Sequence, residues 1–166
     1  MSEADALQRL LDEQAIRRLA DRLFVLTDRK AWDEARALFV DGELAVDMSS
    51  LAGGGPARIT AAQLFAGFAQ GLHADKASHH MTTNAEVALD GDRATLRAQG
   101  YAWNRVPGLA GGSDLWETWG TYRLPCARTP DGWRLAGLEY VAKYSRGNEA
   151  VRIHTAAPPS GVDAAG

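Results

Sequence analysis

The feature of this sequence that most constrains its fold is a change of hydrophobic period near residue 78. Before that point, apolar residues recur every three to five positions, which is typical of amphipathic helices. After it, apolar and polar residues alternate, as they do in half-buried β-strands. Because the helices come first and the strands later, the pattern predicts an α+β domain. We expect about three N-terminal helices packed on a curved, mostly antiparallel sheet.

Three helices and one early strand are expected before residue 78. The first helix spans residues 5–29, and a second of about ten residues begins near Trp32. The third opens at Thr60, because Thr60 and Gln63 form a capping-box pattern. Residues 43–49 alternate as a strand does, and the run GlyGlyGlyPro that follows predicts a flexible loop.

The second half of the chain predicts strands joined largely by hairpins. Residues 80–89 and 93–104 flank Asp90-Gly91-Asp92, a hairpin signal. Further strands are expected at 116–124 and, after a turn, at 133–144. A sheet of this kind, closed at one end by helices, encloses a conical apolar pocket. We expect residues 1–155 to form one domain and residues 156–166 to form a mobile tail.

Composition excludes several classes of function. A length of 166 residues suits one domain with a sizeable core, and a net charge of −3 argues against nucleic acid as a partner. No apolar run approaches the roughly 20 residues that span a bilayer, and no secretion signal is evident, so we expect a cytoplasmic protein without membrane contact. The lone Cys126 has neither a disulfide partner nor metal-ligand spacing. His73 and His154 are isolated in the sequence and are expected at the surface.

One carboxylate and one imidazole stand out as candidates for chemistry. Asp28 lies where the first helix ends, and the stretch SerHisHisMetThrThrAsn supplies His79 and His80 about fifty residues later. A histidine, with a pKa of about 6.5 as a residue type, suits acid–base work near neutral pH, and a carboxylate on one ring nitrogen fixes its tautomer. Asp28 could instead be a helix-end cap, and either histidine could be purely structural.

Strand parity leaves the choice of histidine open. Counting back by twos from Leu89 and Val87 places His79 on their face of the sheet. A β-bulge between residues 80 and 86 would place His80 there instead. Adjacent strand residues point to opposite faces, so the two histidines make a poor metal-binding pair, and we expect no metal.

Several segments taken in order carry a family resemblance. They are the long helix that runs into Asp28, the pairs Trp32-Asp33 and Leu38-Phe39, the stretch 78–84 before its hairpin, and ArgThrProAspGlyTrpArgLeu near the end. Over roughly residues 5–150 the chain resembles the SnoaL-like family of the NTF2-like superfamily. Within it, the chain is most similar to scytalone dehydratase, bile-acid 7α-dehydratase and hexachlorocyclohexane dehydrochlorinase. The resemblance implies a cofactor-free lyase that pairs Asp28 with His80, and a homo-oligomer, a trimer before a dimer.

The chain also departs from those lyases. Asn104, or else Trp103, stands where scytalone dehydratase has a second catalytic histidine, and Lys143 lies near a position where the other two enzymes use an arginine. The aromatic residues of the later strands could be core or subunit interface, but Trp103 and Trp119 are expected to line the cavity. The candidate substrate-binding residues are therefore His79, Trp103, Asn104, Trp119, Tyr140 and Lys143.

These observations predict a cofactor-free lyase (dehydratase-like) or an isomerase. Its substrate would be a small apolar cyclic or polyketide-like molecule, with His80 taking the proton, Asp28 supporting the ring, and Asn104 or Lys143 assisting the leaving oxygen. The absence of the second histidine favours an alternative, a non-catalytic NTF2-like ligand-binding or oligomerisation module.

Overall fold

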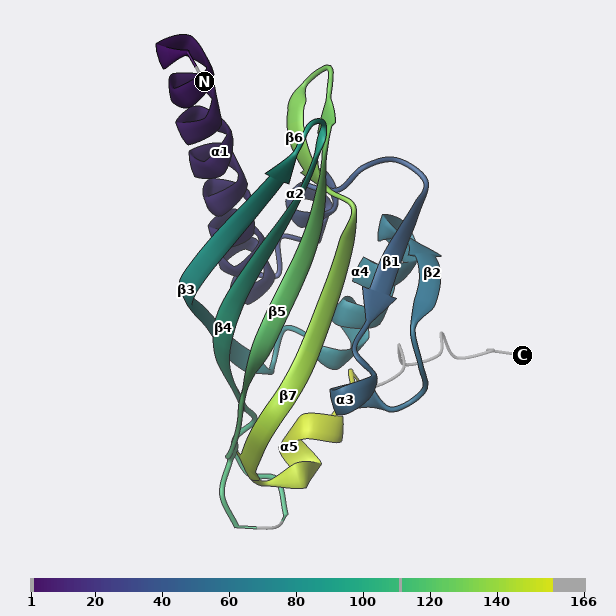
Figure 1. Cartoon of the computed structure of the whole chain (residues 1–166). Coiled ribbons are helices and arrows are strands. Elements are labelled where there is room, and N and C mark those ends of the chain that lie inside the picture. Colours follow the sequence, from purple (N-terminus) through teal and green to yellow (C-terminus); the bar gives the residue numbers. More distant parts are fainter. Residues whose placement is uncertain (1, 111, 157–166) are drawn as a thin grey trace, which may run out of the picture.

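A computed structural model describes residues 2–110 and 112–156 (Figure 1). Its helices are α1 (Glu3–Asp28), α2 (Trp32–Arg36), α3 (Ser49–Ala52), α4 (Ala61–Gly71) and α5 (Glu149–Ile153). Its strands are β1 (Glu43–Asp47), β2 (Ala57–Thr60), β3 (Ala77–Asp90), β4 (Arg93–Arg105), β5 (Leu115–Thr129), β6 (Gly132–Leu135) and β7 (Gly137–Gly147). Of the predicted tail, residues 156–166, all but residue 156 lie outside the described residues.

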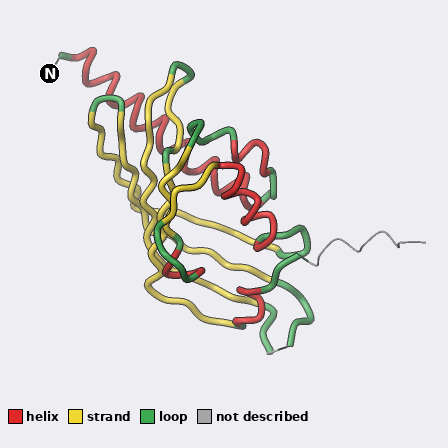
Figure 2. The backbone as a smooth tube through the Cα atoms, turned by 90° about the vertical axis from the view of Figure 1, so that its right-hand side faces the viewer, coloured by secondary structure: helices red, strands yellow, loops and turns green. Residues whose placement is uncertain are grey.

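The strands form one mixed, unclosed sheet in the order β2-β1-β7-β5-β4-β3, with β6 paired to the end of β5. The β1–β7 pair is parallel and the other pairs are antiparallel. Figure 2 shows the strands as a curved layer with helices gathered on one side. The expected α+β architecture is confirmed.

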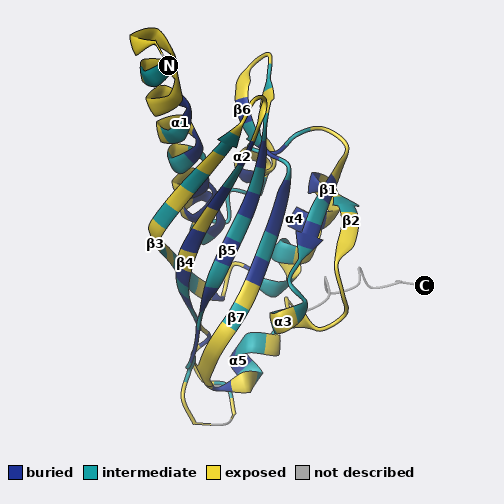
Figure 3. Cartoon of the chain, viewed as in Figure 1, coloured by how far each residue is buried: buried dark blue, intermediate teal, exposed yellow. Residues whose placement is uncertain are grey.

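Helix α1 crosses the inner face of the sheet and buries its C-terminal half there. Ile16 and Leu23 are fully buried in the same core as Leu96 and Leu124 of the sheet. The N-terminal half extends beyond the sheet and is largely exposed (Figure 3), with Leu10 64% exposed. The core therefore lies between the second half of α1 and the middle of the long strands.

Two glycines let aromatic rings lie flat on the inner face of the sheet. A Cβ atom at Gly100 would come within 2.6 Å of the Tyr122 ring, and one at Gly120 within 2.6 Å of the Tyr140 ring. Both tyrosine side chains are buried, and their ring centroids lie 4.6 Å apart. Because neither glycine has a side chain, the two tyrosine rings can pack against the inner face of the sheet, next to the space where a cavity can form.

Several short elements differ from the sequence predictions. Helix α2 has five residues instead of about ten, and α3, β2 and α5 were not predicted. The segment 133–144 is divided into β6 and β7, and its register against β5 shifts by one residue between them, from Cys126 opposite Leu135 to Arg123 opposite Glu139. The capping box at Thr60 and Gln63 is present as predicted.

The β3–β4 pair contains a bulge. Thr83 pairs with Gln99, but Glu86 pairs with Arg97, so β3 carries one residue more than β4 between these pairs. Asn84, inside the bulge, has a left-handed backbone with φ of 53°, a conformation that asparagine tolerates better than most residues. The extra residue reverses the parity of the strand, so Val87, Leu89 and His80 share the inner face.

Candidate active site

The end of α1 fixes the position of Asp28. Ala31 donates its backbone N–H to the Leu26 carbonyl and Lys30 donates to that of Thr27, the hydrogen-bond pattern of a Schellman motif. Lys30 takes the left-handed conformation of this motif, with φ of 59°. The helix therefore ends sharply, and the side chain of its last residue, Asp28, lies toward the start of β3.

Both oxygens of Asp28 contact His80. The ring nitrogen Nδ1 of His80 lies 2.6 Å from Oδ1 of Asp28, and the backbone N–H of His80 donates to Oδ2 at 2.8 Å. An ionised carboxylate can only accept, so Nδ1 carries the hydrogen and Nε2 is left as the basic nitrogen. Asp28 is not a side-chain cap of α2, whose N-cap Ala31 has no such bond.

Two further polar side chains support the carboxylate. Ser78, two residues before His80 on the same face of β3, donates its hydroxyl to Oδ1 of Asp28 at 3.1 Å. Lys30 in turn donates to the Ser78 hydroxyl at 2.5 Å. The carboxylate is thus held from the strand and from the turn that follows α1.

The surroundings of Asp28 favour its ionised form. Burial by itself would raise the pKa of Asp28, but hydrogen bonds from the His80 ring and backbone and from Ser78, with the positive charge available on His80, outweigh it. The pKa of Asp28 therefore lies below its ordinary value. Burial lowers the pKa of Lys30, and the negative charge of Asp28 partly offsets that effect.

The His80 ring is packed as well as hydrogen-bonded. Its plane stacks on Phe24 of α1 with centroids 5.8 Å apart and an interplanar angle of 19°. Phe24 in turn contacts the Tyr122 ring at a centroid distance of 4.7 Å. Only 13% of the His80 side chain is exposed, so one side of the ring faces protein and the remainder faces a cavity.

That cavity has a volume of about 240 Å³ and is mostly apolar. Helices α1, α3, α4 and α5 surround it above the inner face of the sheet. Its walls include Leu23, Phe24, Thr27, Met48, Leu51, Ala52, Gly67, Phe68, Gly71, Leu72, Lys76, His80, Ala102, Asn104, Trp116, Thr118, Tyr122, Leu138, Tyr140 and Arg152. A small cyclic molecule fits a space of this size.

Few polar groups enter the cavity. Asn104 on β4 is buried, and its Oδ1 atom has no hydrogen-bond partner among the described residues. The Tyr140 hydroxyl lies 3.1 Å from Oγ1 of Thr118, and burial raises the pKa of Tyr140 despite that hydrogen bond. Lys76 is only 1% exposed. A buried amide oxygen without a partner is costly unless a ligand donates a hydrogen bond to it.

The predicted binding residues are divided between the two faces of the sheet. Asn104 and Tyr140 line the cavity, but the expectation that Trp103 and Trp119 do so is wrong. They point to the opposite face because they follow inward-facing positions by one residue. There Trp103 packs on His79 with centroids 5.8 Å apart, and Trp119 packs between Tyr101 and Tyr144.

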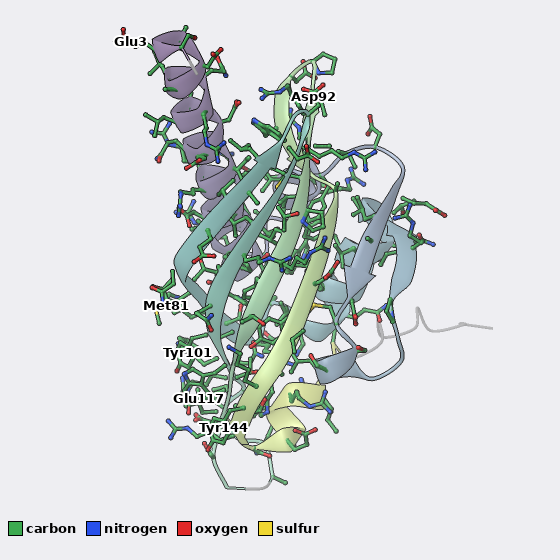
Figure 4. The ribbon with its side chains drawn as sticks, viewed as in Figure 1. Glu3, Met81, Asp92, Tyr101, Glu117 and Tyr144 are labelled. Carbon is green, nitrogen blue, oxygen red and sulfur yellow. The ribbon has the colours of Figure 1, made fainter. Side chains whose placement is uncertain are left out.

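His79 and Lys143 also lie outside the cavity lining. The His79 side chain is 48% exposed, and its Nδ1 is 3.7 Å from Oδ2 of Asp28. Lys143 is exposed and donates to Gln99 at 3.1 Å. Figure 4 shows Tyr101, Glu117 and Tyr144 of this outer face gathered at one end of the sheet.

Of the two remaining histidines, His73 contradicts the expectation of a surface position, whereas His154 is partly exposed. His73 is buried, and its Nε2 lies 2.8 Å from Nδ1 of His154, which follows α5. Burial lowers the pKa of His73, and the charges of His154 and Lys76 lower it further. This contact attaches the segment after α5 to the end of α4.

Sequence reasoning missed several residues around the site. Ser78 could have been found by stepping back two residues from His80 along the strand, whereas Lys76, Phe24 and Lys30 gave no such signal. Within the described ranges, no group of three His, Cys, Asp or Glu side chains is placed to share a metal ion. None of the helices described is long and apolar enough to cross a membrane.

Solved structures place this fold in the NTF2-like superfamily. The Kfla4162 protein from Kribbella flavida is 28% identical, with a TM-score of 0.81 over 87% of this chain and 99% of that one. An NTF2-like protein from Novosphingobium aromaticivorans is 30% identical, with a TM-score of 0.66 over 90% and 92% of the two chains. A type 2 hexachlorocyclohexane dehydrochlorinase has the same fold at 19% identity, with a TM-score of 0.66 over 93% and 98%.

The family follows from the sequence. The model of the SnoaL-like domain matches residues 8–139, which is more than half of the chain. The protein therefore belongs to the SnoaL-like family. Comparison with curated protein sequences found no significant match.

Proposed function

We propose that this protein is a cofactor-free lyase (dehydratase-like) or isomerase that uses Asp28 and His80 as an acid/base dyad. The observation that carries the proposal is the 2.6 Å hydrogen bond between Oδ1 of Asp28 and Nδ1 of His80 at the wall of an apolar cavity. The dehydrochlorinase of the same fold is, by its name, an elimination enzyme, which supports a reaction that begins by removing a proton. The expected substrate is a small apolar cyclic or polyketide-like molecule.

In this mechanism Nε2 of His80 takes a proton from carbon, and the positive charge that develops on the ring is stabilised by Asp28. Such proton transfer contributes roughly 10²–10⁴ to the rate. For elimination, the electron pair of the C–H bond forms a double bond as the leaving group departs. For isomerisation, the proton returns at a different carbon. The Asn104 amide, which lines the cavity from β4, can bond the substrate oxygen.

The sharpest variant is Asp28→Asn. If the Asn oxygen accepts from the His80 backbone, its NH₂ group faces Nδ1 of His80, which must then accept and leave the hydrogen on Nε2. The basic nitrogen is lost although the shape is kept. We expect Asp28→Asn and His80→Ala to lower the rate about 10²–10⁴-fold.

Proton abstraction can be measured directly as exchange of solvent deuterium into candidate cyclic ketones and β-hydroxy ketones, followed by mass spectrometry. The same samples report loss of water. Asp33→Asn is the control, because that carboxylate is 96% exposed on α2. If both dyad variants exchange at the wild-type rate on an identified substrate, the assignment of Asp28 and His80 fails. If wild type binds candidate ligands but exchanges none of them, the non-catalytic ligand-binding module becomes the correct assignment.

The predicted homo-oligomer remains a further part of this proposal. The outer face of the sheet exposes Val141 and Tyr144 by more than half, and Met81 by nearly half. Such a surface favours association with a second copy, with a trimer expected before a dimer. Light scattering after gel filtration gives the number of subunits.

A further inference from the structure

A buried lysine shares the cavity with His80 and has no part in the proposed proton transfer. Lys76 lies just before β3 and is 1% exposed. Among residues 2–110 and 112–156, its ammonium has one hydrogen-bond partner, the Arg152 backbone carbonyl at 3.2 Å, and no carboxylate within ion-pair distance. An ammonium has three hydrogens to donate, so its bonding capacity is largely unused.

Lys76 lies directly before β3, in the bend that leads into the strand, and His80 is the fourth residue of that strand. Lys76 and His80 both line the cavity, while Asn104 pairs across from Ser78 between them. The lining of the cavity therefore combines a cation that precedes β3, an imidazole on β3, and on the neighbouring strand an amide whose oxygen has no partner among the described residues.

The lysine carries a charge that the protein does not neutralise. Burial, together with the charges of the nearby cations Lys30 and Arg152, lowers the pKa of Lys76 to about 8. Arg152 is satisfied by Glu149 at 2.5 Å and by the Leu51 carbonyl at 2.7 Å. Since a buried charge without a partner is costly, a negatively charged group on a ligand would supply the ion-pair partner that Lys76 lacks among the described residues.

We propose that the cavity binds a small cyclic or aromatic carboxylic acid, whose carboxylate pairs with Lys76. The apolar ring then lies on Tyr122 and Leu138, the Asn104 amide bonds a polar substituent, and the far end of the ring faces His80. Of the two cations that line the cavity, Arg152 is already paired with Glu149, and the one remaining charge, on Lys76, matches the single charge of a carboxylate. This inference rests on the proposed function, because it names the substrate class of the same site.

The test compares each acid with its own neutral amide. 2-Naphthoate and cinnamate are titrated against 2-naphthamide and cinnamamide by calorimetry at pH 7, with wild-type protein, Lys76→Met and Lys76→Gln. Lys76→Gln keeps a donor for the Arg152 carbonyl and so provides a second neutral variant if Lys76→Met folds poorly. Arg93→Met, an exposed cation at the far end of β4, controls for the loss of one positive charge.

We expect wild type and Arg93→Met to bind the acid about 10- to 100-fold more tightly than the amide, as a charge-assisted hydrogen bond provides. Both Lys76 variants should lose this preference, with amide affinity changed less than about threefold. Equal affinity for acid and amide, a preference that survives in the Lys76 variants, or no saturable binding by either acid overturns the proposal. Asp28→Asn should keep the acid preference, so failure of the dyad is distinguished from failure of the carboxylate site.

Discussion

Replacing Asp12 by Asn should reveal how α1 is fixed to the sheet. Asp12 accepts from two Arg128 nitrogens, at 3.0 and 2.6 Å, and from the Trp133 indole at 3.0 Å. Gln8 adds a fourth hydrogen bond at 3.2 Å. Asn presents one acceptor oxygen and one donor nitrogen to these donors, so it cannot satisfy the bidentate guanidinium. The variant keeps the shape of the residue and removes the charge.

The magnitude follows from the pKa of Asp12. The Arg128 hydrogen bonds lower this pKa from 3.8 to about 2, with further help from Trp133 and Gln8, although burial opposes the shift. One unit corresponds to about 1.4 kcal/mol, so the ionised form adds about 2 kcal/mol to the free energy of unfolding, allowing for the partial exposure of Arg128. Because the folded-state pKa is the lower one, this stability is present above pH 4 and is lost as the pH falls toward 2. About half of it should remain at pH 3.

Urea unfolding at pH 7 and pH 3, followed by tryptophan fluorescence, measures this effect. We expect Asp12→Asn to be about 2 kcal/mol less stable than wild type at pH 7 and about 1 kcal/mol less stable at pH 3. Asp33→Asn, on an exposed carboxylate, should stay within about 0.5 kcal/mol at both values. If the difference between Asp12→Asn and wild type is the same at both values of pH, charge is not what attaches the helix, and the reasoning fails.

Three other variants test the surroundings of the site. Because burial and the charges of Lys30 and Arg152 depress the pKa of Lys76, the free energy of unfolding of wild type should rise on the order of 2 kcal/mol between pH 8 and 10. Urea unfolding of Lys76→Met should show no such rise. An unchanged rise in this variant would refute the assignment of the effect to Lys76. Lys30→Gly removes the ammonium that donates to Ser78, but glycine suits the positive φ at this position. The deuterium-exchange rate should therefore fall about tenfold, which is near 1.4 kcal/mol in activation free energy, while the urea midpoint stays equal or rises. An unaltered rate would exclude a supporting role of Lys30 in the dyad. The methyl group of Gly120→Ala would overlap a β7 carbonyl and a tyrosine ring, so thermal unfolding should show a loss of about 2 kcal/mol or more in the free energy of unfolding. If the variant is as stable as wild type, the sheet adjusts at this position.

The predictable parts of the fold are those with long, regular patterns. Helix α1 and the β3–β4 hairpin were evident because each repeats its period over ten or more residues. Helices α3 and α5 have four and five residues, too few for a period, and β2 is an edge strand whose four residues pair only with β1. Their positions depend on tertiary contacts, such as the hydrogen bond from Arg152 to the Leu51 carbonyl, that no local pattern encodes.

The site could be predicted only as far as the sequence shows which residues of each strand share a face of the sheet. Asp28 and His80 could be paired only by allowing a bulge, and the structure has one extra residue in β3 between Thr83 and Glu86. The same parity rule, applied to β4 and β5, would have separated Asn104 from Trp103 and Trp119, since neighbouring residues face opposite sides. Applied backward from His80, it would also have reached Ser78. The one extra residue in the β3 bulge thus determines whether His80 or His79 points toward Asp28. It also determines which face of the sheet the other side chains before the bulge occupy.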